Sequence, residues 1–211
     1  GDSDRVLAAV MKILAISCSP RSNGNTVAML AEVLAAAEEA GAKVELYSVA
    51  GKDIQPCDGC WTCVETGRCH KDDDTETLIG KMLAADGIVF GVPVYFHGMP
   101  AQAKAIIDRT ISLNTPERSL TNKVLGVVAS AGSLGLVQVL KDFIYYAHVK
   151  HMLPANHVAA YPSMEDGIEK MPRCRQELRD LGRQMVALVN LDFRYPPEYI
   201  RGPGTFGTHT M

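Results

Sequence analysis

The chain has 211 residues, of which 47% are hydrophobic and 21% are charged, and its formal net charge is −3. This ordinary balance excludes a disordered chain, and without a basic excess there is no electrostatic case for binding nucleic acid. No apolar run approaches the roughly 20 residues that a membrane-spanning helix needs, and residues 1–10 lack the apolar stretch of a secretory signal. We therefore expect a one-domain cytoplasmic protein with no membrane or nucleic-acid partner.

Strand-like and helix-like segments alternate along most of the chain. Short apolar runs predict buried strands, and longer runs of helix formers with apolar positions at helical spacing predict helices. In chain order we expect strand 12–17, helix 26–40, strand 43–49, a long loop over 50–73, helix 75–85, strand 87–92, helix 100–113 with Pro100 in its first turn, strand 123–129, helix 136–149, a weaker strand 157–160 and helix 173–191. We interpret residues 1–10 as an N-terminal extension or an expression remnant, and residues 192–211 as a Pro/Gly-rich C-terminal arm.

This order of elements predicts an α/β fold over residues 11–191, with a cysteine-rich insertion at 50–73. Strands that are buried on both faces indicate a parallel sheet covered by helices on each side, which is a three-layer αβα sandwich. For a five-stranded parallel sheet we favour the flavodoxin-like order 2-1-3-4-5, in which ligands bind at the carboxyl ends of the strands. The alternative is half of a Rossmann fold, but the G-x-G-x-x-G fingerprint is missing after the first strand.

The loop after the first predicted strand has the composition of a phosphate site. It leads into a helix start, where unpaired N–H groups and the helix dipole favour an anion. Short polar side chains and one cation accompany it: Ser19, Arg21, Ser22, Asn25 and Thr26. It is not a Walker loop, because G-K-[ST] is absent. The alternative is an ordinary helix cap and turn, in which small polar residues are common.

Two further loops follow the third and fourth predicted strands, at residues 93–99 and 130–135. Tyr95 and Phe96 can flank a flat ring system, while Gly132 and Gly135 allow backbone amides to approach the ring edge. The alternative for the two aromatic residues is core packing. A phosphate after strand one and a ring beside strands three and four together describe flavin mononucleotide (FMN).

Three segments resemble the motifs of NAD(P)H-dependent FMN reductases of the flavodoxin-like superfamily. They read SPRSNGNT from residue 19, GVPVYFHGMPAQAKAIIDR from residue 91 and ASAGSLG from residue 129. The resemblance implies noncovalent FMN and NAD(P)H as co-substrate. It implies that the FMN phosphate is held by Ser19, Arg21, Asn25 and Thr26, and that the ring lies by Pro93, Val94, Tyr95, Phe96, Ala131, Gly132 and Gly135.

A cluster of cysteines, Cys57-x2-Cys60-x2-Cys63-x5-Cys69, is the sharpest chemical signal in the chain. Thiolates are soft ligands for iron–sulfur clusters and for zinc. Structural zinc more often uses two separated C-x2-C pairs, and free thiols or a disulfide without metal are a further alternative. The compact spacing resembles archaeal and bacterial iron–sulfur flavoproteins. That resemblance implies a [4Fe–4S] cluster beside FMN in a homodimer or homotetramer.

Two charged groups are interpreted as structural. Asp72, Asp73 and Asp74 resemble a metal site, but we favour a solvated helix start with Asp74 as its cap. Asp108 and Arg109 match the FMN reductase pattern, and we expect them to anchor their helix rather than to catalyse.

The sequence thus predicts an FMN-dependent oxidoreductase. It would pass electrons from NAD(P)H or a ferredoxin-like donor to a small acceptor such as a quinone, a flavin, a metal ion or oxygen. We name no catalytic side chain, because the flavin performs the chemistry. The alternatives are a non-enzymatic electron carrier between proteins and a redox sensor based on thiols or a cluster.

Overall fold

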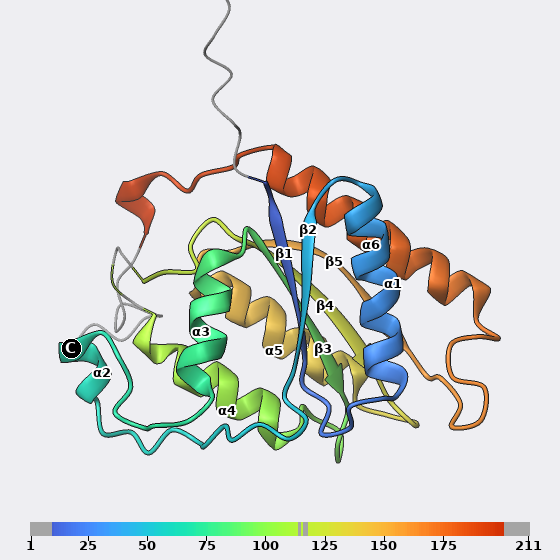
Figure 1. Ribbon diagram of the computed structural model, residues 1–211, viewed down its shortest axis with the longest axis horizontal. Coiled ribbons are helices and arrows are strands. Elements are labelled where there is room, and N and C mark those ends of the chain that lie inside the picture. The colour runs from blue at the N-terminus through green and yellow to red at the C-terminus, as the bar shows by residue number, and fades with distance from the viewer. Residues whose placement is uncertain (1–9, 114, 116–117, 201–211) are drawn as a thin grey trace, which may run out of the picture.

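A computed structural model describes residues 10–113, 115 and 118–200, and its centre is a five-stranded sheet (Figure 1). All neighbouring strands are parallel, and their order is β2-β1-β3-β4-β5. The predicted fold and strand order are therefore confirmed. The strands are β1 (Lys12–Ser17), β2 (Lys43–Ser48), β3 (Gly87–Pro93), β4 (Val124–Ser130) and β5 (Leu153–Ala160).

Helices cover both faces of the sheet, as apolar strands require. α1 (Asn25–Glu39) and α6 (Pro172–Asn190) lie on one face, while α3 (Thr75–Ala84), α4 (Ala101–Arg109) and α5 (Leu136–Val149) lie on the other. Two short 3-10 helices, η1 (Thr110–Ser112) and η2 (Pro197–Tyr199), follow α4 and α6. None of these helices in the described ranges has the length and apolar character needed to cross a membrane.

Two apolar cores, one on each face, hold the layers together. Every residue of β3 and β4 is buried. On the α1/α6 face, Met29 and Met185 belong to the same buried cluster as Val89 of β3. On the opposite face, the rings of Phe90 and Phe143 lie 4.9 Å apart. The middle strands thus fix the helices on both sides, and with them the loops that begin and end the helices.

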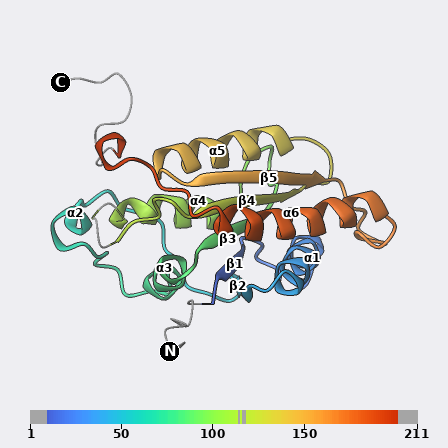
Figure 2. The ribbon, with the colours of Figure 1, turned by 90° about the horizontal axis from the view of Figure 1, so that it is seen from above.

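The structure differs from the predicted elements in four places. The helix expected over 100–113 ends at Arg109, and η1 follows it. A five-residue helix, α2 (Thr62–Thr66), lies within the segment 50–73 that we expected to be a loop, and Figure 2 shows it standing beyond α3 and α4. β5 begins at Leu153 rather than at residue 157, because an edge strand tolerates Pro154. Pro100 precedes the first turn of α4 in an extended conformation instead of lying inside it.

The predicted terminal segments are described only in part. Residues 1–9 and 201–211 lie outside the described residues. The start of the C-terminal arm runs back toward the amino ends of the strands, where the Tyr195 N–H donates to Asn122 Oδ1 at 2.8 Å. The loops after β1, β3, β4 and β5 lie at the opposite edge of the sheet, where the strands end.

Candidate functional site

The loop between β1 and α1 leads directly into the first turn of α1. This helix begins at Asn25 after Gly24, and no side-chain hydrogen bond caps its first N–H groups. Such a helix start attracts anions through its free donors and its dipole. Arg21, whose backbone N–H donates to Ser19 Oγ at 3.1 Å, adds a cation to the same loop. The loop therefore offers the groups that a phosphate needs.

Hydrogen bonds tie this loop to the ends of two other strands. Thr26 Oγ1 and Ser130 Oγ lie 3.0 Å apart and are buried, which joins α1 to the end of β4. Asn25 Nδ2 donates to the carbonyl of Ser163, after β5, at 3.2 Å. The segments that carry the predicted phosphate and ring residues are thus joined at one edge of the sheet.

A cavity of about 350 Å³ opens between these loops. Most of the predicted FMN residues line it: Ser19, Arg21, Asn25, Thr26, Pro93, Val94, Tyr95, Ala131 and Gly132. Ser22, Phe96 and Gly135 do not. The fourth wall of the cavity follows β5 and is not among the predicted residues: it is formed by Tyr161, Pro162, Ser163 and Met164. That wall was foreseeable, because all strands of a parallel sheet end at the same edge.

A tight turn explains why Phe96 and Gly135 lie outside the cavity. Tyr95 and Gly98 exchange two backbone hydrogen bonds, of 2.9 and 3.1 Å. Between them, Phe96 (φ 47°) and His97 (φ 67°) adopt left-handed conformations, which cost about 1–3 kcal/mol each. The turn leaves the Phe96 side chain fully exposed. Gly135, at φ 98°, packs directly against this turn. A Cβ at position 135 would lie 2.6 Å from His97 Cα, so only glycine leaves room for the turn.

The cysteine segment forms a second cavity, on the flank of the molecule. α2 lies between two left-handed residues, Trp61 and Gly67, so the chain bends sharply at both ends of the helix. The cavity measures about 350 Å³, and Trp61, Arg109 and Ile111 are among the residues that line it. All of the predicted ligands face it as free thiols: Cys57, Cys60, Cys63 and Cys69.

The spacing of these thiols does not match a closed zinc site. Tetrahedral zinc with Zn–S bonds of about 2.3 Å would place its sulfurs about 3.8 Å apart. In the described ranges, the group whose ligand atoms all lie within 4.8 Å of one another is Asp58, Cys60 and His70. Asp58 is already paired with Lys71 and His70, each at 3.1 Å, and hydrogen bonds from Lys71 and Cys60 do most to hold the pKa of its carboxyl below the usual range.

Burial raises the pKa of Cys63, and the neighbouring thiols Cys69 and Cys57 raise it further. Four thiolates would therefore need a bound cation to stay charged together. A metal cluster would supply that positive charge, and a cavity of about 350 Å³ has room for a group larger than a single ion.

A buried ion pair connects the cysteine cavity to α3 and α4. Arg109 Nη1 lies 2.6 Å from Asp73 Oδ2, and both side chains are almost fully buried. The Asp73 carboxylate also accepts the N–H groups of Gln55 (3.0 Å) and Thr75 (2.9 Å). Burial acts to raise the pKa of Asp73, but the hydrogen bonds from Arg109 and these backbone groups outweigh it and lower the pKa to about 2.

This pair corrects one prediction and confirms another. Asp73 is not solvated, and Asp73 rather than Asp74 bonds the first turn of α3, while Asp74 Oδ2 accepts the Asp53 N–H at 2.9 Å. Arg109 does anchor its helix, since Nη1 also donates to the Gln55 carbonyl at 2.9 Å. Its Nε–H is buried and has no partner among the described residues. An orphaned donor of this kind costs about 1–3 kcal/mol.

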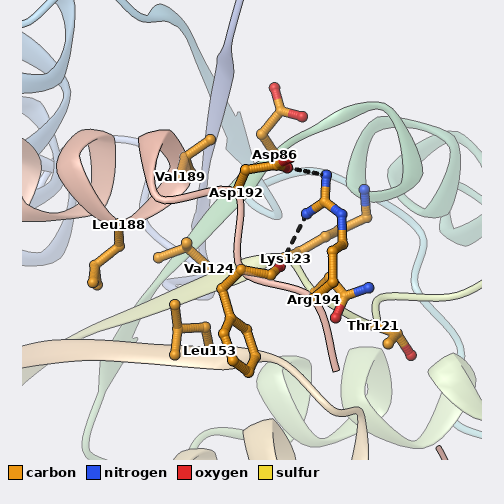
Figure 3. A pocket seen from close by; sticks show the side chains of 11 residues that line it. Asp86, Thr121, Lys123, Val124, Leu153, Leu188, Val189, Asp192 and Arg194 are labelled. Carbon is orange, nitrogen blue, oxygen red and sulfur yellow. Dashed lines mark hydrogen bonds and ion pairs between the residues drawn. The ribbon is translucent and has the colours of Figure 1, made fainter. Parts of the chain in front are cut away.

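A third cavity, of about 340 Å³, lies at the opposite edge of the sheet, among the amino ends of β3, β4 and β5 and the start of the C-terminal arm (Figure 3). Arg194 reaches across it, pairs with Asp192 and donates to the Phe193 carbonyl at 3.0 Å. None of the residues that line it belongs to the first turn of a helix. This edge therefore offers a phosphate much less than the α1 loop does.

A family model described as NADPH-dependent FMN reductase matches residues 11–165. The chain belongs to the NADPH-dependent FMN reductase family. One similar protein is an iron–sulfur flavoprotein of Methanocaldococcus jannaschii. It is 36% identical to this chain over 193 residues, which cover 86% of this chain and 98% of that protein.

Solved structures share the fold at lower identity. An NAD(P)H:quinone oxidoreductase from Methanothermobacter marburgensis has a TM-score of 0.65 at 15% identity, covering 84% of this chain and 100% of that one. The flavodoxin-like WrbA-like protein from Agrobacterium tumefaciens has a TM-score of 0.55 at 18% identity, covering 87% and 97%. The predicted family and flavodoxin-like fold are thereby confirmed, and the protein is a flavoprotein of an oxidoreductase family.

Proposed function

We propose that this FMN reductase family member binds FMN in the cavity at the carboxyl edge of the sheet. In this proposal it passes electrons from NAD(P)H or a ferredoxin-like donor to a small acceptor. The main support for this proposal is that the uncapped start of α1, Arg21 and Tyr95 all line one open cavity. When bound, FMN supplies the redox chemistry, because it exchanges electrons either as hydride or singly.

The side chains of the cavity bind and orient the cofactor. The first turn of α1 and Arg21 neutralise the phosphate, and Thr26, fixed by Ser130, keeps that turn against the sheet. Tyr95 is partly exposed and lines the cavity, so its ring is available to pack on a flavin. Met164 is mostly exposed at the wall after β5, which leaves the cavity open to a second small molecule.

We further propose that the four cysteines hold a [4Fe–4S] cluster. The support is that four thiols line one cavity without closing to zinc distances, together with the name of the Methanocaldococcus relative. The cluster would transfer single electrons when bound. Trp61 and Ile111 line the same cavity and would exclude part of the water around the sulfurs.

The proposal also includes a homodimer or a homotetramer. α5 carries the exposed apolar side chains Val137, Ile144 and Tyr145, whose spacing of seven and eight residues places them on one face of the helix. An exposed apolar helix face is a common site of contact between chains. Val137→Asp should therefore lower the mass measured by light scattering, whereas an unchanged mass would remove the support of this surface.

The first experiment is purification without oxygen, followed by a visible spectrum and by assays of iron, sulfide and FMN. Flavin bands with about four irons per chain would support both cofactors. Flavin without iron would leave an FMN reductase with spare thiols. Rapid bleaching of the flavin by NADPH would favour the enzyme, and bleaching only by a reduced ferredoxin would favour the electron-carrier alternative.

Arg21→Ala tests the phosphate site. Loss of a charge-assisted hydrogen bond of about 1.5–3 kcal/mol should raise the Kd for FMN roughly 10- to 150-fold. Arg183→Ala is the matched control, since Arg183 lies in the second half of α6, pairs with Asp180 of the same helix and does not line the cavity. Equal FMN affinity in wild type and Arg21→Ala would remove the assignment.

Cys60→Ser tests the cluster, and the measurement is the visible spectrum. We expect this variant to lose the iron absorption and to keep the flavin bands. Cys174→Ser on α6 is the control and should keep both.

A further inference from the structure

Arg109 is the last residue of α4, and its side chain forms part of the wall of the cysteine cavity. The side chain is 1% exposed, so bulk water does not satisfy its donors. Nη1 donates to Asp73 and Gln55, and Nη2 donates to Asp73 at 3.1 Å. Nε–H is the donor that stays without a partner among the described residues.

We propose that Arg109 raises the reduction potential of the iron–sulfur cluster in the cysteine cavity, by donating its Nε–H to a sulfur and by holding its positive charge at the cavity wall. The inference rests on the proposed function, because it requires that the four cysteines hold a cluster. It gives Arg109 a role beyond anchoring α4, as a residue that tunes the cluster without ligating it.

The charge distribution supports this role. The Arg109 side chain and Cys69 line the same cavity. Asp73 does not line the cavity, so the positive member of the pair is the one that faces the sulfurs.

A second buried basic side chain lies against η1, the 3-10 helix that follows Arg109. Lys150 Nζ donates to the Thr110 carbonyl at 2.7 Å. Two carboxylates also line the cysteine cavity, and both are already paired. Asp58 pairs with Lys71 and His70, and Asp108 pairs with Lys104.

The physical consequence concerns the difference between two redox states. A reduced cluster carries one more negative charge than an oxidised one, so a nearby cation stabilises the reduced state more. An N–H donor to a cluster sulfur or a cysteine Sγ acts in the same direction, and both effects raise the potential. Arg109 combines them at one position.

The experiment uses Arg109→Lys in the intact protein, prepared without oxygen. Lysine keeps a positive charge that can still face Asp73, but it lacks the Nε–H and the planar fork. Iron, sulfide and FMN are counted first, and the cluster is then titrated electrochemically by electron paramagnetic resonance. We expect full iron content and a reduced-to-oxidised ratio about tenfold lower at a fixed potential, which corresponds to a midpoint about 59 mV more negative.

Arg118→Lys is the matched control. Arg118 also has a buried Nε–H without a partner among the described residues, and it pairs with Glu76 at 3.0 Å. It does not line the cysteine cavity. Its variant should therefore keep the wild-type midpoint, and an equal shift in both variants would overturn the inference.

A measurement on the unchanged protein covers the case in which Arg109→Lys does not fold. Electron–nuclear double resonance on protein labelled with ¹⁵N-arginine should show one nitrogen coupled to the reduced cluster, and absence of that coupling overturns the inference. Iron in the wild type with an unshifted Arg109→Lys midpoint overturns the inference alone. Wild type without iron overturns the cluster proposal as well, so the two failures are distinguishable.

Discussion

Gly91 lies in β3, directly under the first turn of α1, and its replacement by alanine should affect FMN binding and stability together. A Cβ at this position would lie 2.6 Å from Leu30 Cδ1 and 2.9 Å from Thr26 Cγ2. Ordinary carbon contacts begin at about 3.5 Å, so the first turn must retreat by roughly 0.6 Å or more. Thr26 is buried and β-branched, which leaves it little freedom to turn aside.

We expect this displacement of α1 to lower the free energy of unfolding and to raise the Kd for FMN. Overpacking of this kind costs about 1–3 kcal/mol of unfolding free energy. If the retreat of α1 weakens one charge-assisted phosphate contact, the Kd for FMN rises roughly 10-fold or more. Thermal unfolding of the FMN-free protein measures the first quantity, because bound FMN would add its own stabilisation, and quenching of flavin fluorescence on titration measures the second.

Gly126→Ala in β4 is the control. Its Cβ would lie 2.7 Å from Met185 Sδ, on α6 rather than on α1, and Gly126 lies four residues before Ser130 at the end of β4. It should also lose stability, but its FMN affinity should be that of the wild type. The reasoning is refuted if both variants lose FMN affinity equally, or if Gly91→Ala is destabilised while its Kd stays unchanged.

Three further predictions concern stability and reactivity. Asp73→Asn should cost about 3 kcal/mol at neutral pH, and because the pKa of Asp73 is lowered to about 2, denaturation curves should show this gap present above about pH 4 and lost as the pH falls toward 2. In thermal melts, Gly182→Ala should destabilise, since its Cβ would overlap the Val33 carbonyl, whereas Gly80→Ala, with open space around it, should stabilise by about 0.5–1 kcal/mol. Cys18, whose burial raises its pKa to about 12, should resist iodoacetamide until the protein unfolds.

The sequence predicts the sheet well because its signal is local. The apolar runs at 12–17, 87–92 and 123–129 are strands within one residue at each end. The start of β5 was missed because it contains proline and polar residues, and an edge strand needs neither a full ladder of N–H donors nor an apolar outer face. α2 was missed because a helix of five residues is too short for a periodic pattern.

At the candidate sites, the sequence predicted which loops form each site, but not which side chains contact one another there. It identified the loops after β1, β3 and β4, but could not say that Phe96 would be turned outward by a left-handed turn. It also could not choose which of three consecutive aspartates is buried. That choice depends on Arg109, 36 residues from Asp73 in the chain, and no local pattern carries it.

α4 begins after the turn at the FMN cavity and ends at Arg109 in the wall of the cysteine cavity. Its nine residues span about 13.5 Å. A helix of this length cannot stretch, so mutations in either loop can alter the chemistry of one cavity while the distance between the two stays constant. During evolution, only an insertion or deletion within α4 itself would change that distance, and each added turn would change it by about 5.4 Å.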